Sequence, residues 1–263
     1  MPVSPGQLDH WARRQLSDYD RHQPGLMFED RGLSLTVSDA YEIQRRVAAL
    51  RQERGETLAG YKVGCTSQPV RRQLGLDHPV FGHVFASEMH PSGCVLGWAN
   101  YDGLAIEGEF AVRLGVDVAR AEWLLENHLR AIQSFFPVIE LHNFVVRGGT
   151  QTAQELIANN AIHAGVLLPA REFPYRTPGD LLNRPITVLC NGSVLGEADN
   201  RALHDELGSR LALLATHLEQ AGTLLRKGQI VLTGSPLPLY RVSPEDVVEV
   251  RCPGMPTVTA AVV

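Results

Sequence analysis

The sequence has none of the features that mark a membrane or secreted protein. No apolar run approaches the roughly 18 residues that a transmembrane helix needs, and the opening Met-Pro-Val-Ser-Pro-Gly lacks the apolar stretch of a signal peptide. Its four cysteines, Cys65, Cys94, Cys190 and Cys252, lie far apart and form no CxxC pair and no zinc-ligand spacing. We therefore expect a cytoplasmic protein whose thiols stay reduced.

Basic residues are too few and too scattered for a nucleic-acid-binding protein. Lys and Arg total 24 against 29 Asp and Glu, so the net charge is −5, and no basic run or basic-aromatic stripe offsets it. Internal repeats and low-complexity segments are also missing. The 263 residues, with 44% hydrophobic and 20% charged residues, are those of an ordinary globular protein that can bury a sizeable core.

Hydrophobic spacing divides the chain into an N-terminal helical region, residues 1–56, and a strand-rich remainder, residues 57–263. Helical periodicity predicts helices over 6–22 and from Thr36, a capping residue, to about Gly55. In the remainder we expect helices over 119–134 and 206–221, and strands over 58–66, 106–110, 138–141, 186–195, 229–233, 247–251 and 257–263. This mixture predicts an α+β fold or a β-rich roll.

Three local expectations concern connections and packing. Asn191-Gly192, between two short apolar runs, predicts a hairpin with a type I′ turn. The helix expected between the strands at 106–110 and 138–141 predicts a crossover connection, with Pro137 preceding the second strand. We expect the two N-terminal helices to form a packing layer or an oligomer contact.

Carboxylates occupy two strands whose other residues are apolar. Residues 106–110 read Ile-Glu-Gly-Glu-Phe, and Glu140 interrupts a second apolar run. Because strand side chains alternate between faces, Glu107 and Glu109 point the same way, about 7 Å apart, and three carboxylates converge if Glu140 is on a neighbouring strand. A hard ion, Mg²⁺ or Mn²⁺, would relieve their repulsion. The alternative is an edge strand with its polar face in water.

Lys62 is a charged residue inside the glycine-interrupted strand predicted over 58–66. A buried lysine needs an anion or loses its charge, so near the glutamates it would form an ion pair or carry a proton. The alternative, which the sequence alone favours, is that Lys62 lies on an edge strand and is exposed to solvent. Asp77 is a weaker candidate for acid-base chemistry, since it lies in turn-like sequence where an Asx turn is its alternative role.

Several motifs in chain order resemble one enzyme family. They are GYKVGCT over 60–66, DHPVFG over 77–82, IEGEF over 106–110, PVIE over 137–140 and LTGS over 232–235. The chain resembles the 2-keto-4-pentenoate hydratase / 4-oxalocrotonate decarboxylase group of the fumarylacetoacetate hydrolase superfamily. Residues 38–44 also look like the N-terminal region of that group, so the resemblance covers nearly the whole chain.

The resemblance implies an α+β fold: a mixed β-sandwich roll of the fumarylacetoacetate hydrolase C-terminal type with an N-terminal helical region. It implies Mg²⁺ or Mn²⁺ held by Glu107, Glu109 and Glu140, with Lys62 and Asp77 as catalytic residues. It also implies a homo-oligomer built from dimers.

The implied reaction is the hydration of a 2-hydroxy-2,4-dienoate, of the 2-hydroxypenta-2,4-dienoate type, to a 4-hydroxy-2-oxo acid in the catabolism of aromatic hydrocarbons. Candidate substrate-binding residues are Ser235, at the carboxylate end of the substrate, Asn160 and His142. The period of two places His142 on the strand face of Glu140. Its alternative is a histidine that only contacts the site or solvent.

Because the sequence departs from the family pattern at several positions, the resemblance does not determine which substrate the protein uses. Asn159 stands where the family usually has Asp, in an Asp-x-x-Ala-Asp-Asn-Ala pattern. His142 and Asn143 follow Glu140 in place of a small acidic stretch, and residues 196–205 lack the usual His-Pro.

Three alternatives to the hydratase therefore remain: a decarboxylase of the 4-oxalocrotonate type, a C–C hydrolase on the same metal–enolate platform, and a non-catalytic partner subunit. Decarboxylation would need a positive group for a second carboxylate, and Lys62 and Arg241 are the candidates.

Overall fold

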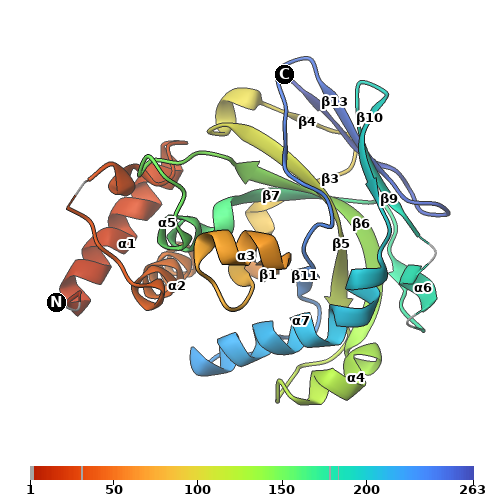
Figure 1. Cartoon of the computed structure of the whole chain (residues 1–263), viewed down its shortest axis with the longest axis horizontal. Coiled ribbons are helices and arrows are strands. Elements are labelled where there is room, and N and C mark those ends of the chain that lie inside the picture. The colour runs from red at the N-terminus through yellow and green to blue at the C-terminus, as the bar shows by residue number, and fades with distance from the viewer. Residues whose placement is uncertain (1–2, 31, 178, 183) are drawn as a thin grey trace.

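The structure, a computed structural model, describes residues 3–30, 32–177, 179–182 and 184–263. Figure 1 shows the N-terminal helices at one end of the molecule and a small β-sheet at the other, with a large sheet between them. The combination of helices with two mixed sheets confirms the predicted α+β fold, a mixed β-sandwich roll.

The N-terminal helices begin where the sequence predicts their caps. Ser4 and Gln7 form a capping box at the start of the first helix, and Thr36 and Asp39 form one at the start of the second. These elements are α1 (Pro5–Asp20), η1 (Leu26–Glu29), a 3₁₀ turn, and α2 (Val37–Glu53).

Apolar residues of these helices share one core with the start of the large sheet and with α5 (Ala153–Ala158). Ala12 and Ile43, for example, are fully buried in this cluster together with Ile157. The predicted packing layer is confirmed, whereas the division of the chain at residues 56 and 57 stays a prediction.

The large sheet has the strand order β2-β1-β11-β5-β6-β7-β3, with β12 paired to β5 and β8 to β6. Its neighbours are antiparallel except for the parallel pairs β1–β11 and β3–β7. The strands are β1 (Leu58–Gly64), β2 (Val80–Phe85), β3 (Met89–Pro91), β5 (Leu104–Leu114), β6 (Ile132–Asn143), β7 (His163–Leu168), β8 (Phe173–Pro174), β11 (Ile230–Leu232) and β12 (Tyr240–Arg241).

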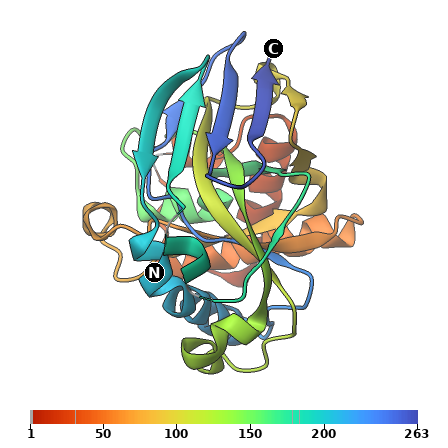
Figure 2. The ribbon, with the colours of Figure 1, turned by 90° about the vertical axis from the view of Figure 1, so that its right-hand side faces the viewer.

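The small sheet packs on one face of the large one, and its strands lie side by side in Figure 2. Val188 and Val250 of this sheet join Ile106 and Phe110 in the main hydrophobic core. Its strands, in the order β10-β9-β13-β14-β4, are β4 (Cys94–Leu96), β9 (Ile186–Cys190), β10 (Ser193–Ala198), β13 (Val247–Arg251) and β14 (Val258–Val262).

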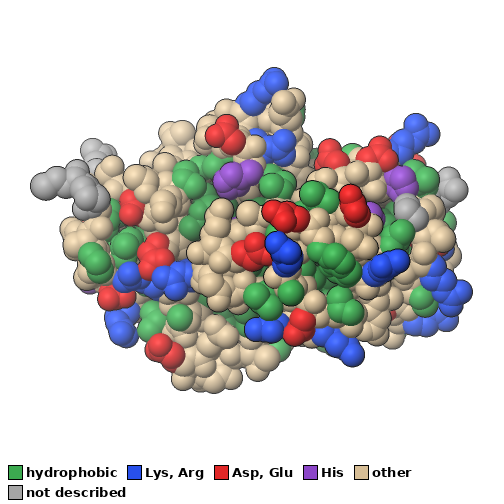
Figure 3. All heavy atoms as spheres, turned by 90° about the horizontal axis from the view of Figure 1, so that it is seen from below, with side chains coloured by type: hydrophobic (Ala, Val, Ile, Leu, Met, Phe, Trp, Pro, Cys, Tyr) green, Lys and Arg blue, Asp and Glu red, His purple; other side chains and the backbone are tan. Residues whose placement is uncertain are grey.

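Two further helices, α4 and α7, pack on each other at the end of the large sheet away from the small one (Figures 1 and 2). On the face shown in Figure 3, acidic and basic side chains are interspersed among apolar ones. The remaining helices and 3₁₀ turns are α3 (Gln68–Leu74), α4 (Trp123–Ala131), α6 (Gly179–Leu182), α7 (Arg201–Gln220), η2 (Ala86–Glu88), η3 (Trp98–Asn100) and η4 (Asn160–Ile162).

One expectation about a connection is confirmed. The β9–β10 hairpin turns at Asn191 and Gly192, whose φ angles of 51° and 76° are those of a type I′ turn. The cysteines within the described ranges are all free. No helix of the described residues has the length and apolarity of a membrane span.

The predicted crossover is wrong, because β5 and β6 are adjacent antiparallel strands joined through α4. Pro137 lies inside β6 rather than before it. The ladder from β6 to β8 ends at Phe135 and the ladder to β7 begins at Ile139, so this proline falls where the second edge of β6 has no partner strand among the described residues. Helix α7 begins at Arg201, earlier than the predicted start at residue 206.

Two half-buried histidines make the fold sensitive to acid. Burial, reinforced by the charge of His217, lowers the pKa of His83 to about 4, and burial and the charge of His78 do the same for His217. Unfolded histidines titrate near pH 6.5, so the unfolded chain takes up protons first as the pH falls. Stability is therefore lost between about pH 6.5 and 4.

We expect His217→Gln to reduce this loss by up to about 3 kcal/mol, because a neutral amide takes up no proton. The measurement is urea unfolding followed by circular dichroism at pH 7 and pH 4.5, in the variant and in the wild type. An equal loss of stability in the two proteins would contradict the assignment.

Candidate metal centre and active site

Two neighbouring strands bring the carboxylates together. Glu107 of β5 is the register partner of Glu140 of β6, and Glu109 lies two residues further along the same face. Gly108 points to the opposite face, where a Cβ atom would lie 2.5 Å from Cγ2 of Val188 in the small sheet. The glycine thus permits the two sheets to approach, while both β5 carboxylates face away from the small sheet.

The pKa values of two of these carboxyl groups shift in opposite directions. Glu109 is fully buried, and burial together with the charges of Glu140 and Glu107 raises its pKa well above the ordinary value. Burial would also raise the pKa of Glu140, but Lys62, His142 and His163 hold that pKa well below its usual range. Neighbouring residues thus compensate the negative charge of Glu140 but not that of Glu109.

Lys62 is the compensating cation. Its Nζ atom lies 3.1 Å from Oε1 of Glu140 and donates a hydrogen bond to the carbonyl oxygen of Ala161 at 3.3 Å. Burial would lower the pKa of the ammonium group, but the charges of Glu140, Glu107 and Glu109 raise it above the ordinary value. Lys62 is therefore buried and protonated, and the exposed edge lysine that the sequence alone favours is wrong.

The two oxygens of Glu140 face different partners. Oε1 contacts Lys62 and lies 2.7 Å from Nδ1 of His163. Oε2 lies 3.4 Å from Nε2 of His142, and the same nitrogen lies 3.4 Å from Oε2 of Glu107. Glu107, Glu140 and His142 form the one group within the described residues whose potential metal-ligand atoms all lie within 4.8 Å of one another.

Glu109 lies outside that group, and only one of its two carboxylate oxygens accepts a hydrogen bond. Its Oε2 accepts a hydrogen bond from the backbone N–H of Gly234 at 2.5 Å. Its Oε1 is buried and has no hydrogen-bond partner among the described residues. A buried carboxylate oxygen without a donor is costly unless a cation completes its surroundings.

Lys62, Glu107, His142 and Ser235 line one cavity of about 450 Å³. The Ser235 hydroxyl lies within hydrogen-bonding distance of the carbonyl oxygens of Gly108 and Leu237. Much of the remaining wall is apolar and includes Val70, Leu74, Val80, Phe144, Leu156 and Leu237. The cavity combines charged groups on one side with a hydrophobic wall, as a site for a small organic acid requires.

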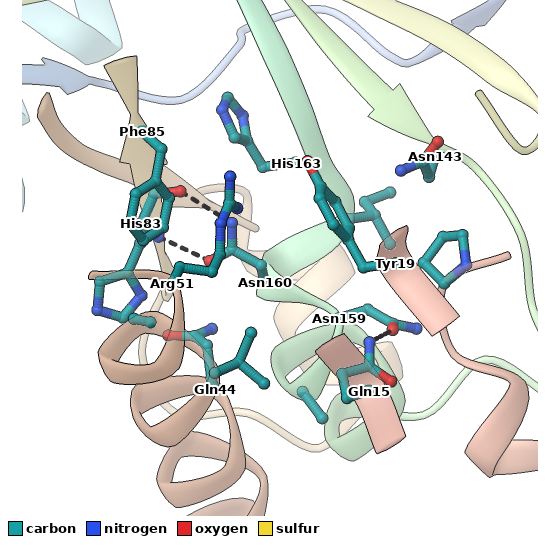
Figure 4. Close-up of a pocket in the computed structure, with 15 residues that line it drawn as sticks. Gln15, Tyr19, Gln44, Arg51, His83, Phe85, Asn143, Asn159, Asn160 and His163 are labelled. Atoms are coloured by element: carbon teal, nitrogen blue, oxygen red, sulfur yellow. Dashed lines mark hydrogen bonds between the residues drawn. The ribbon is translucent and has the colours of Figure 1, made fainter. Parts of the chain in front are cut away.

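Besides the buried Glu109 and Glu140, two residues predicted for the site, Asp77 and Asn160, are not among those that line this cavity. Asp77 is exposed in the turn after α3. The side-chain amide of Asn160 accepts a hydrogen bond from the backbone N–H of His83 at 2.7 Å and donates one to its carbonyl oxygen at 2.8 Å (Figure 4). Asn160 therefore fastens η4 to strand β2.

A second, much smaller cavity of about 30 Å³ lies between the N-terminal helices and the large sheet (Figure 4), and its wall includes His163, whose Nδ1 contacts Glu140. His163, Asn159 and Gln15 line it, and each has a buried polar atom without a partner among the described residues. Oδ1 of Asn159 accepts a hydrogen bond from the Gln15 amide. The Asn that replaces the family Asp thus faces this second cavity.

His163 links this region to the carboxylates, and sequence reasoning missed it. Its Nε2 atom lies 3.9 Å from Oε2 of Glu88. Glu88 in turn accepts a hydrogen bond from the Arg51 guanidinium at 2.7 Å and one from the Tyr19 hydroxyl at 2.5 Å. No local signal could have found this network, since its members come from α1, α2, η2 and β7.

Comparison with known proteins supports the family resemblance, although no family model matches the chain. The chain is 30% identical over 221 residues to a 2-keto-4-pentenoate hydratase of Burkholderia vietnamiensis (strain G4 / LMG 22486), covering 84% of each protein. It is 24% identical over 257 residues to a 4-oxalocrotonate decarboxylase of Pseudomonas putida, covering 96% of this chain and 94% of that one.

The fold is that of a solved structure of the 4-oxalocrotonate decarboxylase from Pseudomonas putida G7, complexed with magnesium and adipate. The TM-score is 0.90 and the match covers 99% of both chains at 22% identity. The chain belongs to the 2-keto-4-pentenoate hydratase / 4-oxalocrotonate decarboxylase group, whose members are enzymes.

The network behind Glu140 makes a prediction about stability. Arg51→Met should lower the free energy of unfolding by about 3 kcal/mol, because it leaves the buried Glu88 carboxylate without its cation. Arg54 is the matched control: it also pairs with Glu56 but is 39% exposed, so Arg54→Met should cost less than about 1 kcal/mol. Urea unfolding measures both, and equal losses would contradict the assigned role of Arg51.

Proposed function

We propose that the chain is a divalent-metal-dependent hydratase that adds water to a 2-hydroxy-2,4-dienoate, of the 2-hydroxypenta-2,4-dienoate type, to give a 4-hydroxy-2-oxo acid. One observation carries the proposal: Lys62, Glu107 and His142 line a single cavity in front of the buried Glu140. Membership of a family of hydratases and decarboxylases supports the class of chemistry.

The donor set fits a divalent ion. We propose Glu107, Glu109 and Glu140 as ligands of Mg²⁺ or Mn²⁺, since hard ions prefer carboxylate oxygens. The unpartnered, buried Oε1 of Glu109 supports a cation at this place. The ion would supply Lewis-acid stabilisation of the negative charge on the enolate form of the substrate.

Lys62 supplies the proton chemistry in this proposal. Its ammonium group keeps its proton at neutral pH, because the surrounding carboxylates raise its pKa. It can therefore donate a proton as the dienol becomes a ketone, or bind the substrate carboxylate. Ser235 and the backbone beside it would hold the carboxylate end. Asp77, which is exposed outside the cavity, has no support from the geometry as an acid or base.

The lining of the cavity favours hydration over decarboxylation. Lys62 is the one Lys or Arg among the residues that line it. Arg241, the other candidate for a second carboxylate, lies outside this lining and donates a hydrogen bond to the carbonyl oxygen of Phe144 at 3.1 Å. A monocarboxylate with an apolar tail fits such a site, whereas a dicarboxylate would place its second charge against the hydrophobic wall.

A decarboxylase is the second candidate, and the similarity over nearly the whole chain to 4-oxalocrotonate decarboxylase supports it. A C–C hydrolase or a non-catalytic partner subunit would use the same fold. We also propose a cytoplasmic homo-oligomer built from dimers, in the catabolism of aromatic hydrocarbons.

A panel of substrates distinguishes these functions. The purified protein is assayed with 2-hydroxypenta-2,4-dienoate, 4-oxalocrotonate and acylpyruvates in Mg²⁺ or Mn²⁺, following loss of dienol absorbance and release of CO₂. The hydratase consumes the dienoate without CO₂. Release of CO₂ identifies the decarboxylase, cleavage of an acylpyruvate identifies the hydrolase, and inactivity with every substrate identifies the partner subunit.

We expect Glu109→Ala to abolish binding of Mn²⁺ with the fold intact, because it removes the carboxylate whose Oε1 has no protein partner. Isothermal titration calorimetry measures the affinity and circular dichroism checks the fold. Glu126→Ala, on the exposed surface of α4, is the control and should bind Mn²⁺ like the wild type. Unchanged Mn²⁺ affinity in Glu109→Ala would reject the ligand assignment.

We expect Lys62→Ala to lower turnover by about 100-fold or more, the contribution of a positioned proton donor. Its effect on Mn²⁺ affinity should be much smaller, because Lys62 contacts Oε1 of Glu140 and leaves Oε2 for the ion. Steady-state kinetics and calorimetry on one preparation separate the two effects. Turnover at the wild-type level would remove Lys62 from the mechanism.

A further inference from the structure

We propose that His142 is a nitrogen ligand of the divalent ion, and that it shifts the preference of the site towards late first-row metals such as Co²⁺. This inference rests on the proposed function, because it requires an ion at the carboxylates. It departs from the all-oxygen ligand set that the family resemblance implies.

Three atoms from two strands carry the proposal. Nε2 of His142 lies 3.4 Å from Oε2 of Glu107 and 3.4 Å from Oε2 of Glu140. Ligands about 2.1 Å from one ion are about 3 to 3.5 Å from their neighbours in octahedral or tetrahedral geometry. Both distances from Nε2 to a carboxylate oxygen are therefore those of neighbouring ligands of one cation, and all three residues offer a ligand atom within 4.8 Å of the others.

The imidazole of His142 has no other partner that explains its position. The residue is 1% exposed, and neither ring nitrogen makes a hydrogen bond within the described residues. Although Nε2 is close to both carboxylates, it is aligned for a hydrogen bond to neither. A buried ring nitrogen that lies 3.4 Å from each of two carboxylate oxygens and bonds to neither lacks the partner that burial demands, and a cation would supply it.

The rest of the site leaves these three atoms free to bind. Oε1 of Glu140 is occupied by Lys62 and His163, so Oε2 is the oxygen that remains. Glu107 and His142 both line the 450 Å³ cavity, where an ion could reach them. The register partner of His142 on β5 is Ala105, whose small side chain leaves room for the imidazole.

A nitrogen ligand changes which ion binds best. Imidazole binds Co²⁺, Ni²⁺ and Zn²⁺ strongly and Mg²⁺ weakly, and affinities rise along the first row. Cys65 also lines the cavity, so Zn²⁺ could gain a thiolate ligand and confuse the comparison. Mn²⁺, Co²⁺ and Mg²⁺ are therefore the better probes.

Pulsed electron paramagnetic resonance of the Mn²⁺-loaded wild-type protein tests the ligand directly. We expect a hyperfine coupling to a directly bound ¹⁴N nucleus. The coupling should vanish in His142→Val and persist in His163→Asn, the matched control that removes the other imidazole in contact with Glu140. Bound Mn²⁺ without ¹⁴N coupling, or coupling that survives in His142→Val, would overturn the proposal.

Calorimetry with Co²⁺ and Mg²⁺ provides a second test. His142→Val should weaken Co²⁺ binding by about 10-fold or more and Mg²⁺ binding by less than about 3-fold. Equal losses for the two ions would overturn the proposal. If valine prevents folding, His142→Asn replaces it, and the wild-type coupling remains decisive.

These outcomes also separate this inference from the proposed function. Hydration of the dienoate with Mn²⁺ bound but without a nitrogen ligand would reject His142 alone. Failure of the wild-type protein to bind Mn²⁺ would reject the metal centre and the histidine ligand together.

Discussion

The constraint on which the site depends is the direct cross-strand pairing of Glu107 with Glu140. Like charges opposite each other on adjacent strands are destabilising, more so when one of them is buried. The fold offsets this repulsion with Lys62 on one oxygen of Glu140 and leaves the other oxygen facing Glu107 and His142. That division of Glu140 into a compensated and an available oxygen is what makes a metal centre chemically reasonable here.

Elements far from the cavity support this arrangement. Gly108 lets the small sheet approach β5 on one face, so the carboxylates project from the other. The His163 ring contacts Glu140 through one nitrogen and lies close to Glu88 through the other, and Glu88 pairs with Arg51. A buried polar network thus reaches from the carboxylates to helix α2. The N-terminal helices therefore enclose the rear of the site in addition to packing against the sheet.

Features that depend on the alternation of side chains along one strand could be predicted from the sequence. Features that depend on contacts between distant segments could not. Because side chains alternate along a strand, the sequence placed Glu107 and Glu109 on one face, and the family motifs indicated the fold. The burial of Lys62 could not be read locally, because its partners Glu140 and Ala161 lie on other segments. Pro137 was misplaced because the change of partner strand along β6 has no sequence signal, and the family pattern suggested Asn160, which the structure uses to fasten η4 to β2.

Anomalous diffraction from crystals grown with Mn²⁺ tests the central claim most directly, because it locates the ion without relying on activity. The account predicts one strong peak beside Oε2 of Glu107 and Oε2 of Glu140, at the edge of the cavity that Lys62 lines. Occupied Mn²⁺ sites elsewhere with none between these carboxylates, or glutamate side chains directed apart into solvent, would contradict it.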